Sequence, residues 1–193
     1  MRKIGVLFLM CLLPAGAFAS YSSYGGGGNG DSFRFGWSVL RYDHTTAYSG
    51  QSSTDTQVFN VVSKLGYQWS SGLYLGAAYE SSASYLNATG TPTPEKRISY
   101  GPAIGYGSNG FFIIGSYFSS TTDTKSDGSY FSGGTGYEVE LGYNYPVTSN
   151  FYLGVSLVYN NYTWTNYTVG TTVLSQNNSQ TDTYPALGLG FTF

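Results

Sequence analysis

The sequence has few of the residues on which most catalytic and metal sites depend. It contains one cysteine, one histidine and only 9% charged residues in 193 positions. The single cysteine, Cys11, falls in an N-terminal apolar run, so the rest of the chain cannot form an internal disulfide. One histidine cannot supply a usual transition-metal set. We therefore expect no metal site, no cofactor and no catalytic residues.

Charge is scarce in both signs, with eight Lys and Arg against ten Asp and Glu. A nucleic-acid-binding protein would carry a basic patch or stripe, so nucleic acid is excluded as a partner. Beyond the N-terminus there is also no run of 18 apolar residues. If the chain crosses a membrane, it therefore crosses as β-strands rather than as helices.

Aromatic residues and glycine are abundant instead. Aromatics make up 18% of the chain, including 20 tyrosines, and there are 27 glycines. Tyrosine is favoured at boundaries between water and an apolar phase, and glycine allows tight turns and close approach of backbones. This composition is unlike that of an ordinary soluble domain.

The N-terminus has the pattern of a secretory signal peptide. Arg2 and Lys3 precede the apolar run 4–13, and Ala17-Phe18-Ala19 has the small-x-small form of a cleavage site. We divide the chain into a signal peptide at 1–19, a flexible Gly/Ser-rich leader at 20–31 and a barrel domain at 32–193. Met10 stands where a lipoprotein needs a small residue before the cysteine, which disfavours lipidation.

The last residues alternate strictly between two kinds of side chain. Leu187, Leu189, Phe191 and Phe193 occupy every second position, and small residues lie between them. This is a strand with one apolar face and one face of small residues. The ending resembles the C-terminal strand of bacterial outer-membrane β-barrels, which the barrel-assembly machinery recognises. The resemblance implies that Leu189, Phe191 and Phe193 form an assembly signal.

The same alternation recurs along the chain and predicts eight strands. They cover about 33–40, 59–69, 73–80, 97–106, 111–119, 137–145, 151–159 and 184–193. Three short turns, at 70–72, 108–110 and 146–150, alternate with four longer polar loops at about 43–56, 82–96, 120–134 and 163–180. Both faces of 111–119 are apolar at first, so the pattern leaves open which of them faces outward.

Short turns at one end and long loops at the other are typical of outer-membrane barrels. One strand face is bulky and apolar, whereas the other mixes Gly, Ala and Ser with a few charges. A soluble sandwich or lipocalin-like barrel would have the opposite polarity. Aromatic residues also gather near both strand ends, as at the two interfaces of a bilayer. We predict an all-β, eight-stranded antiparallel up-and-down transmembrane β-barrel of the outer-membrane type.

Six charged residues fall on the face expected to line the barrel interior. They are Arg34, Lys64, Glu80, Arg97, Glu138 and Glu140. The interior of an eight-stranded barrel is just wide enough for side chains to fill, so these charges must pair. Glu80 and Arg97 are predicted at one height, and Lys64 and Glu140 at a lower one. We interpret the six as a network that plugs the lumen; the alternative is a narrow gated channel for ions or small solutes.

A second alternative is an outer-membrane lipid-modifying enzyme, such as a lipid A deacylase or palmitoyl transferase. Deacylase chemistry needs a serine activated by a histidine that an acid holds in place. The only histidine, His44, follows Asp43 and precedes two threonines, which does not reproduce the His-x-Ser of the deacylases. We expect His44 to be a solvated loop residue and the protein not to be an enzyme.

In architecture, Ser32 to Phe193 resembles the small eight-stranded outer-membrane proteins: the OmpX/Ail barrels, the opacity-type barrels and the OmpA transmembrane domain. The resemblance rests on the signal sequence, the hairpin rhythm and the Leu-Gly-Leu-Gly-Phe-Thr-Phe ending. It implies a monomer in the outer membrane, in contact with lipid and lipopolysaccharide. It further implies envelope integrity or binding of an extracellular ligand or host surface through the loops, which here are rich in Ser, Thr, Asn and Gly.

Overall fold

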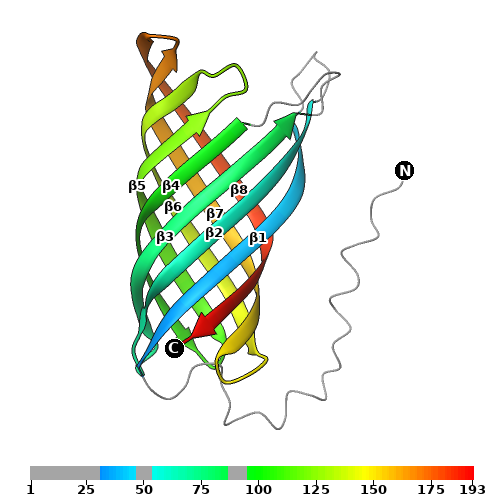
Figure 1. Cartoon of the computed structure of the whole chain (residues 1–193), viewed down its shortest axis with the longest axis vertical. Helices are drawn as coiled ribbons and strands as arrows, with labels where there is room; N and C mark the ends of the chain where they lie inside the picture. Colours follow the sequence, from blue (N-terminus) through cyan, green and yellow to red (C-terminus); the bar gives the residue numbers. More distant parts are fainter. Residues whose placement is uncertain (1–30, 47–53, 87–94) are drawn as a thin grey trace, which may run out of the picture.

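The structure is a computed structural model and describes residues 31–46, 54–86 and 95–193. Eight strands make up this part of the chain (Figure 1): β1 (Ser32–Thr46), β2 (Thr54–Gln68), β3 (Leu73–Leu86), β4 (Glu95–Ser108), β5 (Phe111–Thr124), β6 (Tyr130–Pro146), β7 (Phe151–Val169) and β8 (Thr172–Thr192). The predicted signal peptide and the leader up to residue 30 lie outside the described residues.

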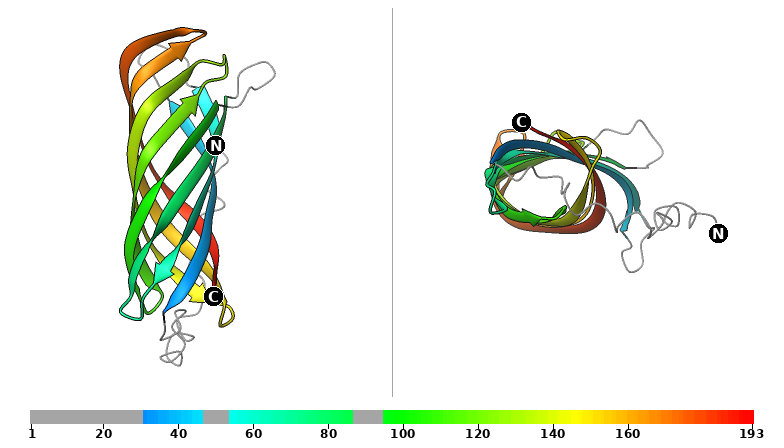
Figure 2. Two further views of the ribbon diagram at one scale, coloured as in Figure 1. Left: turned by 60° about the vertical axis from the view of Figure 1, so that its left-hand side comes forward. Right: turned by 90° about the horizontal axis from the view of Figure 1, so that it is seen from below.

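The strands form a closed ring in sequence order, and each one pairs antiparallel with its neighbours. Figure 2 shows this ring from below, with β1 closing against β8. The predicted fold class, an eight-stranded antiparallel up-and-down barrel, is therefore confirmed. Within the described residues no helix is long and apolar enough to cross a membrane, a finding that has no bearing on crossing by strands.

Large apolar side chains cover the outside of the barrel. The outward band includes Phe33, Leu65, Leu75, Ile104, Phe111, Ile113, Leu141, Leu157 and Leu187, all of which are exposed. In β5 the alternation of exposure places Phe111, Ile113 and Tyr117 outside and Phe118 inside. This settles the orientation that the sequence left open. A barrel with its apolar face outward is stable only where that face meets lipid.

Exposed tyrosines mark the loop-side edge of this band. Tyr79 pairs with Tyr100 across β3 and β4, and Tyr117 pairs with Tyr137 across β5 and β6. Tyr145 lies eight residues beyond Tyr137 in β6 (145 − 137), or about 26 Å at 3.3 Å per residue. With a strand tilt of about 40°, this spacing spans about 20 Å along the barrel axis, slightly less than the apolar band of about 25 Å in transmembrane barrels.

Two of the predicted loops are largely β-structure. Residues 120–134 and 163–180 were expected to be loops, but β5 runs to Thr124, β6 starts at Tyr130, and β7 and β8 leave only Gly170 and Thr171 between them. The hairpin of β7 and β8 rises furthest at the loop end (Figure 1). Its strands have 19 and 21 residues, about twice the 9–11 that cross a bilayer. Cross-strand pairing has overridden the polar, loop-like composition.

The ladder between β1 and β8 is the shortest in the barrel. It covers residues 34–39 of β1 and 187–192 of β8, whereas β1 pairs with β2 along its whole length. At the turn end, Phe33 and Phe193 exchange both backbone hydrogen bonds, at 3.2 and 2.9 Å. Such doubly bonded pairs recur at every second residue of an antiparallel ladder. The next one beyond Val39 and Leu187 would join Arg41 to Pro185.

Proline has no N–H to donate, so Pro185 ends the β1–β8 ladder where this pair would form. We expect Pro185→Thr to let the pair with Arg41 form and to extend the ladder by two residues. The new N–H at position 185 would donate to the Arg41 carbonyl, and closing the pair would hold the Arg41 N–H against the carbonyl of residue 185. Hydrogen exchange at the Arg41 amide should therefore slow by about tenfold. Exchange measured by mass spectrometry or NMR on the folded protein checks this, and an unchanged Arg41 rate would show that proline does not set the limit.

Candidate functional site

The centre of the barrel holds a buried ion pair between β3 and β4. The Nη2 of Arg97 lies 3.1 Å from Oε1 of Glu80, and its Nη1 lies 3.7 Å from Oδ2 of Asp182 in β8. All three side chains are buried, and Glu80 has no exposed surface. We call Glu80, Arg97 and Asp182 the upper charge layer. Burial is costly for charges, so such a group persists only when further hydrogen bonds complete it.

Neutral polar side chains supply those hydrogen bonds. Asn60 donates from Nδ2 to Oε1 of Glu80 at 3.0 Å, and the Tyr162 hydroxyl donates to Oε2 of the same carboxylate. The guanidinium of Arg97 lies over the Tyr162 ring, 4.1 Å from its centroid. Tyr184 accepts hydrogen bonds from Asn60 at 2.6 Å and from Asn160 at 3.2 Å. The upper layer is thus tied to β2 and β7 as well as to its own strands, β3, β4 and β8.

A second group of charges lies nearer the turn end. Lys64 of β2 reaches across the lumen to β6, where its Nζ is 2.7 Å from Oε1 of Glu138 and also contacts Oε2 of Glu140. Ser156 donates to the other oxygen of Glu140 at 2.6 Å. We call Lys64, Glu138 and Glu140 the lower charge layer. One ammonium group is therefore shared by two buried carboxylates, and within the described residues it is the cation that both of them contact.

Arg34 lies at the turn end of the lumen, below both layers. Its guanidinium carbon is 5.9 Å from the centroid of the Tyr152 ring. In the β1–β2 register Arg34 pairs with Gly66, whereas Lys64 pairs with Gly36. Arg34 is thus one inward position closer to the turns than Lys64.

Aromatic rings fill the lumen on the loop side of the upper layer. Phe118, Tyr162 and Trp164 are fully buried, and Phe131 is nearly so. Tyr162 stacks on Phe118 with centroids 5.8 Å apart and on Trp164 at 5.9 Å. We call these four residues the aromatic plug. Interiors packed in this way contain few voids larger than a water molecule.

A partly exposed ion cluster lies above the plug, at the loop end. The Nζ of Lys125 is 2.8 Å from Oδ2 of Asp123 and 3.1 Å from Oε2 of Glu95. Burial alone would lower the pKa of Lys125, but these two carboxylates outweigh it and hold that pKa above its ordinary value. Pairs this exposed contribute about 0–1 kcal/mol, so the cluster orders the loop end without deciding stability.

Five of the six lumenal residues predicted from sequence lie in the two charge layers, and Arg34 lies below them. Glu80 meets Arg97, and Lys64 meets Glu140. Asp182, Tyr162 and Trp164 were missed because the predicted strands ended at residue 159 and began again at residue 184. In β7 and β8 the inward-facing residues have even numbers, and these three residues continue that alternation. The alternation is the sequence signal that could have identified them. The side chain of His44 lies outside what the structure describes.

The predicted assembly signal occupies the turn end of β8. There Leu189 pairs with Trp37 and Phe191 with Phe35, while the Phe193 ring is 75% exposed. No part of this geometry tests recognition by the assembly machinery. In the described ranges no three acidic, histidine or cysteine side chains are grouped as metal ligands would be.

An apolar exterior, a ring of eight tilted strands and a filled polar interior together define the class of transmembrane β-barrels. No family model matches the chain, and no curated protein matches it. Among solved structures, the β domain of the Bordetella autotransporter BrkA aligns with 85% of this chain and 98% of its own, at 9% identity and a TM-score of 0.30. A likeness at this level supports no further statement about the protein.

Proposed function

We propose that this chain is an integral outer-membrane β-barrel with a structural or surface-interaction role and a lumen that does not conduct. The single observation that carries the proposal is the filled lumen. The aromatic plug, the upper layer and the lower layer follow one another along the barrel axis, and each consists of buried side chains. A solute would have to displace all three in succession.

The outer surface supports placement in a membrane. Its apolar band meets lipid, and lipopolysaccharide is the partner proposed for the loop-side rim. Biogenesis would use the barrel-assembly machinery, with Leu189, Phe191 and Phe193 as the signal. We propose a monomer, because the ring closes on itself and uses all eight strands.

The hairpin of β7 and β8 is the surface best suited to contact an extracellular partner. Residues 163–181 carry no charge and are rich in Thr, Ser, Asn and Gln. At its tip Val169, Val173 and Leu174 are exposed. Such a surface suits a partner recognised through amide and hydroxyl hydrogen bonds and small apolar contacts, rather than a polyanion. We do not propose an enzymatic role, because the buried carboxylates are engaged by Lys64 and Arg97.

Planar-bilayer recording tests the closed lumen. We expect no reproducible conductance steps from the wild-type protein and none from Glu140→Gln, because the aromatic plug and the upper layer remain in both. Reproducible steps in the wild type that change in amplitude in Glu140→Gln would overturn the proposal in favour of the gated channel. Different migration of boiled and unboiled samples on SDS gels shows that each protein is folded before recording.

A further inference from the structure

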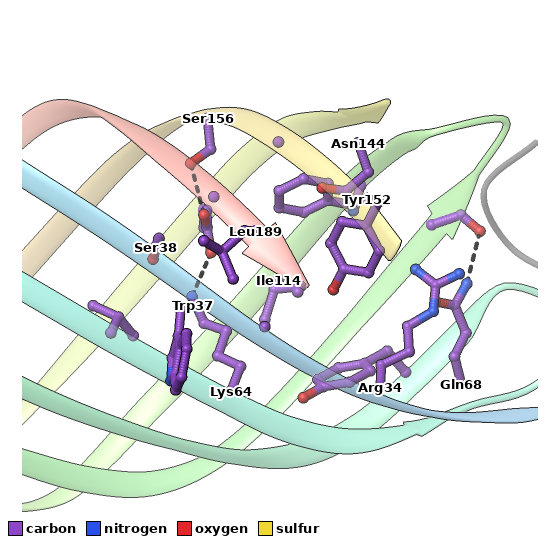
Figure 3. A pocket seen from close by; sticks show the side chains of 18 of the residues that line it. Arg34, Trp37, Ser38, Lys64, Gln68, Ile114, Asn144, Tyr152, Ser156 and Leu189 are labelled. Carbon is purple, nitrogen blue, oxygen red and sulfur yellow. Dashed lines mark hydrogen bonds and ion pairs between the residues drawn. The ribbon is translucent and has the colours of Figure 1, made fainter. Parts of the chain in front are cut away.

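A cavity of about 70 Å³ lies at the turn end of the lumen, below the lower charge layer. Figure 3 shows Arg34, Tyr152 and Asn144 around it, with Lys64 and Ser156 to their left. Several of its lining residues stand next to the short turns, among them Gln68 at the end of β2 and Tyr152 at the start of β7. The cavity therefore belongs to the turn end, and the charge layers separate it from the loop end.

Three charged residues line the cavity: Arg34, Lys64 and Glu140. Lys64 is engaged by Glu138 and Glu140, so the guanidinium of Arg34, with its five N–H donors, is the positive group that the cavity presents to a ligand. Both oxygens of Glu140 are already engaged, one by Lys64 and the other by the Ser156 hydroxyl. The carboxylate therefore has little capacity left to accept further hydrogen bonds. An entering ligand meets mainly hydrogen-bond donors.

Tyr74 provides one of these donors. Its side chain is 95% buried and lines the cavity, yet its hydroxyl makes no hydrogen bond within the described structure. The Tyr74 side chain lies directly against the backbone of two glycines, Gly66 and Gly76. A Cβ at Gly66 would come within 2.6 Å of the Tyr74 Cζ, and a Cβ at Gly76 within 2.5 Å of its hydroxyl oxygen. A buried hydroxyl without a partner is costly, and a ligand that accepts its hydrogen bond removes this cost.

We propose that the cavity is a binding site for a small anion, of the size and chemistry of a carboxylate. The Arg34 guanidinium supplies the charge, and the hydroxyls of Tyr74 and Tyr152 supply directed hydrogen bonds. Its volume is enough for several waters, which fits an anion of a few non-hydrogen atoms. Gly154 and Gly188 form part of the wall and keep that space open. This site goes beyond the proposed structural and surface role.

The test is a titration of the folded full-length protein in detergent micelles with acetate, followed by NMR of backbone amides. We expect saturable shifts at Gly154, Ser156 and Gly188 with a dissociation constant of about 1 mM, within reach of four non-hydrogen atoms. Acetamide has the same shape without the charge and should bind at least about tenfold more weakly. No saturable shift at these amides, or equal binding of the two compounds, would overturn the proposal.

Three variants locate the site. Arg34→Gln should weaken acetate binding by about tenfold or more, and Tyr74→Phe by a few-fold. Gly188→Leu should abolish binding by filling the space; the first added carbon fits, because nothing lies closer than 3.4 Å to it. Lys96→Gln, which removes an exposed positive charge from β4, is the matched control and should bind as the wild type does. The proposal is overturned if the folded Arg34→Gln and Gly188→Leu variants bind acetate as the wild type does. It is also overturned if Lys96→Gln loses acetate binding to the same extent as Arg34→Gln.

Discussion

Replacing Glu80 with alanine is expected to lower the free energy of unfolding by about 3–5 kcal/mol. Glu80 is completely buried and interacts with the Arg97 guanidinium, the Asn60 amide and the Tyr162 hydroxyl. Its removal leaves a buried guanidinium with only Asp182, at 3.7 Å, as a counter-ion. Urea unfolding of the protein in lipid vesicles measures the loss.

Two further variants separate charge burial from packing. In Glu80→Leu combined with Arg97→Met and Asp182→Asn, no charge of the upper layer remains, so this triple variant should be more stable than the Glu80→Leu or Arg97→Met single variant. It should remain below the wild type, because Asn60 and Tyr162 lose an acceptor. Glu95→Gln breaks a pair of the same kind at the partly exposed loop end and should cost at most about 1 kcal/mol. If the triple variant is no more stable than the single variants, the uncompensated charge is not the cause.

Replacing Lys64 with methionine should also cost about 3–5 kcal/mol, for the opposite reason. The change leaves two buried carboxylates, Glu138 and Glu140, without their shared cation. Apart from the Lys64 ammonium, no neighbour within the described residues donates a hydrogen bond to Glu138, so this group has no second source of compensation. The same unfolding measurement applies, with folding checked by gel migration.

Neutralising the carboxylates should reverse most of this loss. We expect Lys64→Met combined with Glu138→Gln and Glu140→Gln to regain more than half of the lost free energy, because no unpaired charge remains buried. Lys96→Gln removes an exposed lysine and should change stability by less than about 0.5 kcal/mol. A Lys64→Met protein as stable as the wild type would contradict the assignment of Lys64 as the sole cation of the lower layer.

The period-two pattern was sufficient to predict the ring. Alternation from Phe33 onward reports which face meets lipid, and register follows from it because a slip of one residue would turn every side chain to the wrong face. The heights of Glu80 with Arg97 and of Lys64 with Glu140 could be estimated for the same reason: tight turns fix the position of each residue relative to the next strand. Asn109 and Gly110, with φ of 53° and 85°, form such a turn.

The loop-end half of the lumen could not be predicted in this way. Residues 163–180 have a loop-like composition, and only their pairing in a long hairpin makes them a strand. Because the predicted strands ended at residue 159 and began again at residue 184, Tyr162 and Trp164 were not recognised as core, nor Asp182 as a partner of Arg97. In β5 apolar residues occupy both faces because Phe112 and Ile114 line the turn-end cavity from inside. Composition alone does not distinguish an apolar side chain that faces lipid from one that packs inside a filled lumen.

The length of the β7–β8 hairpin has an entropic consequence. Its backbone is hydrogen-bonded to within a few residues of the tip, up to the pair Val169 and Thr172. Ordering a flexible loop on binding costs about 1–2 kcal/mol for each residue fixed. A molecule that contacts this tip meets a backbone whose order was established when the barrel folded, so even a small contact area can hold it.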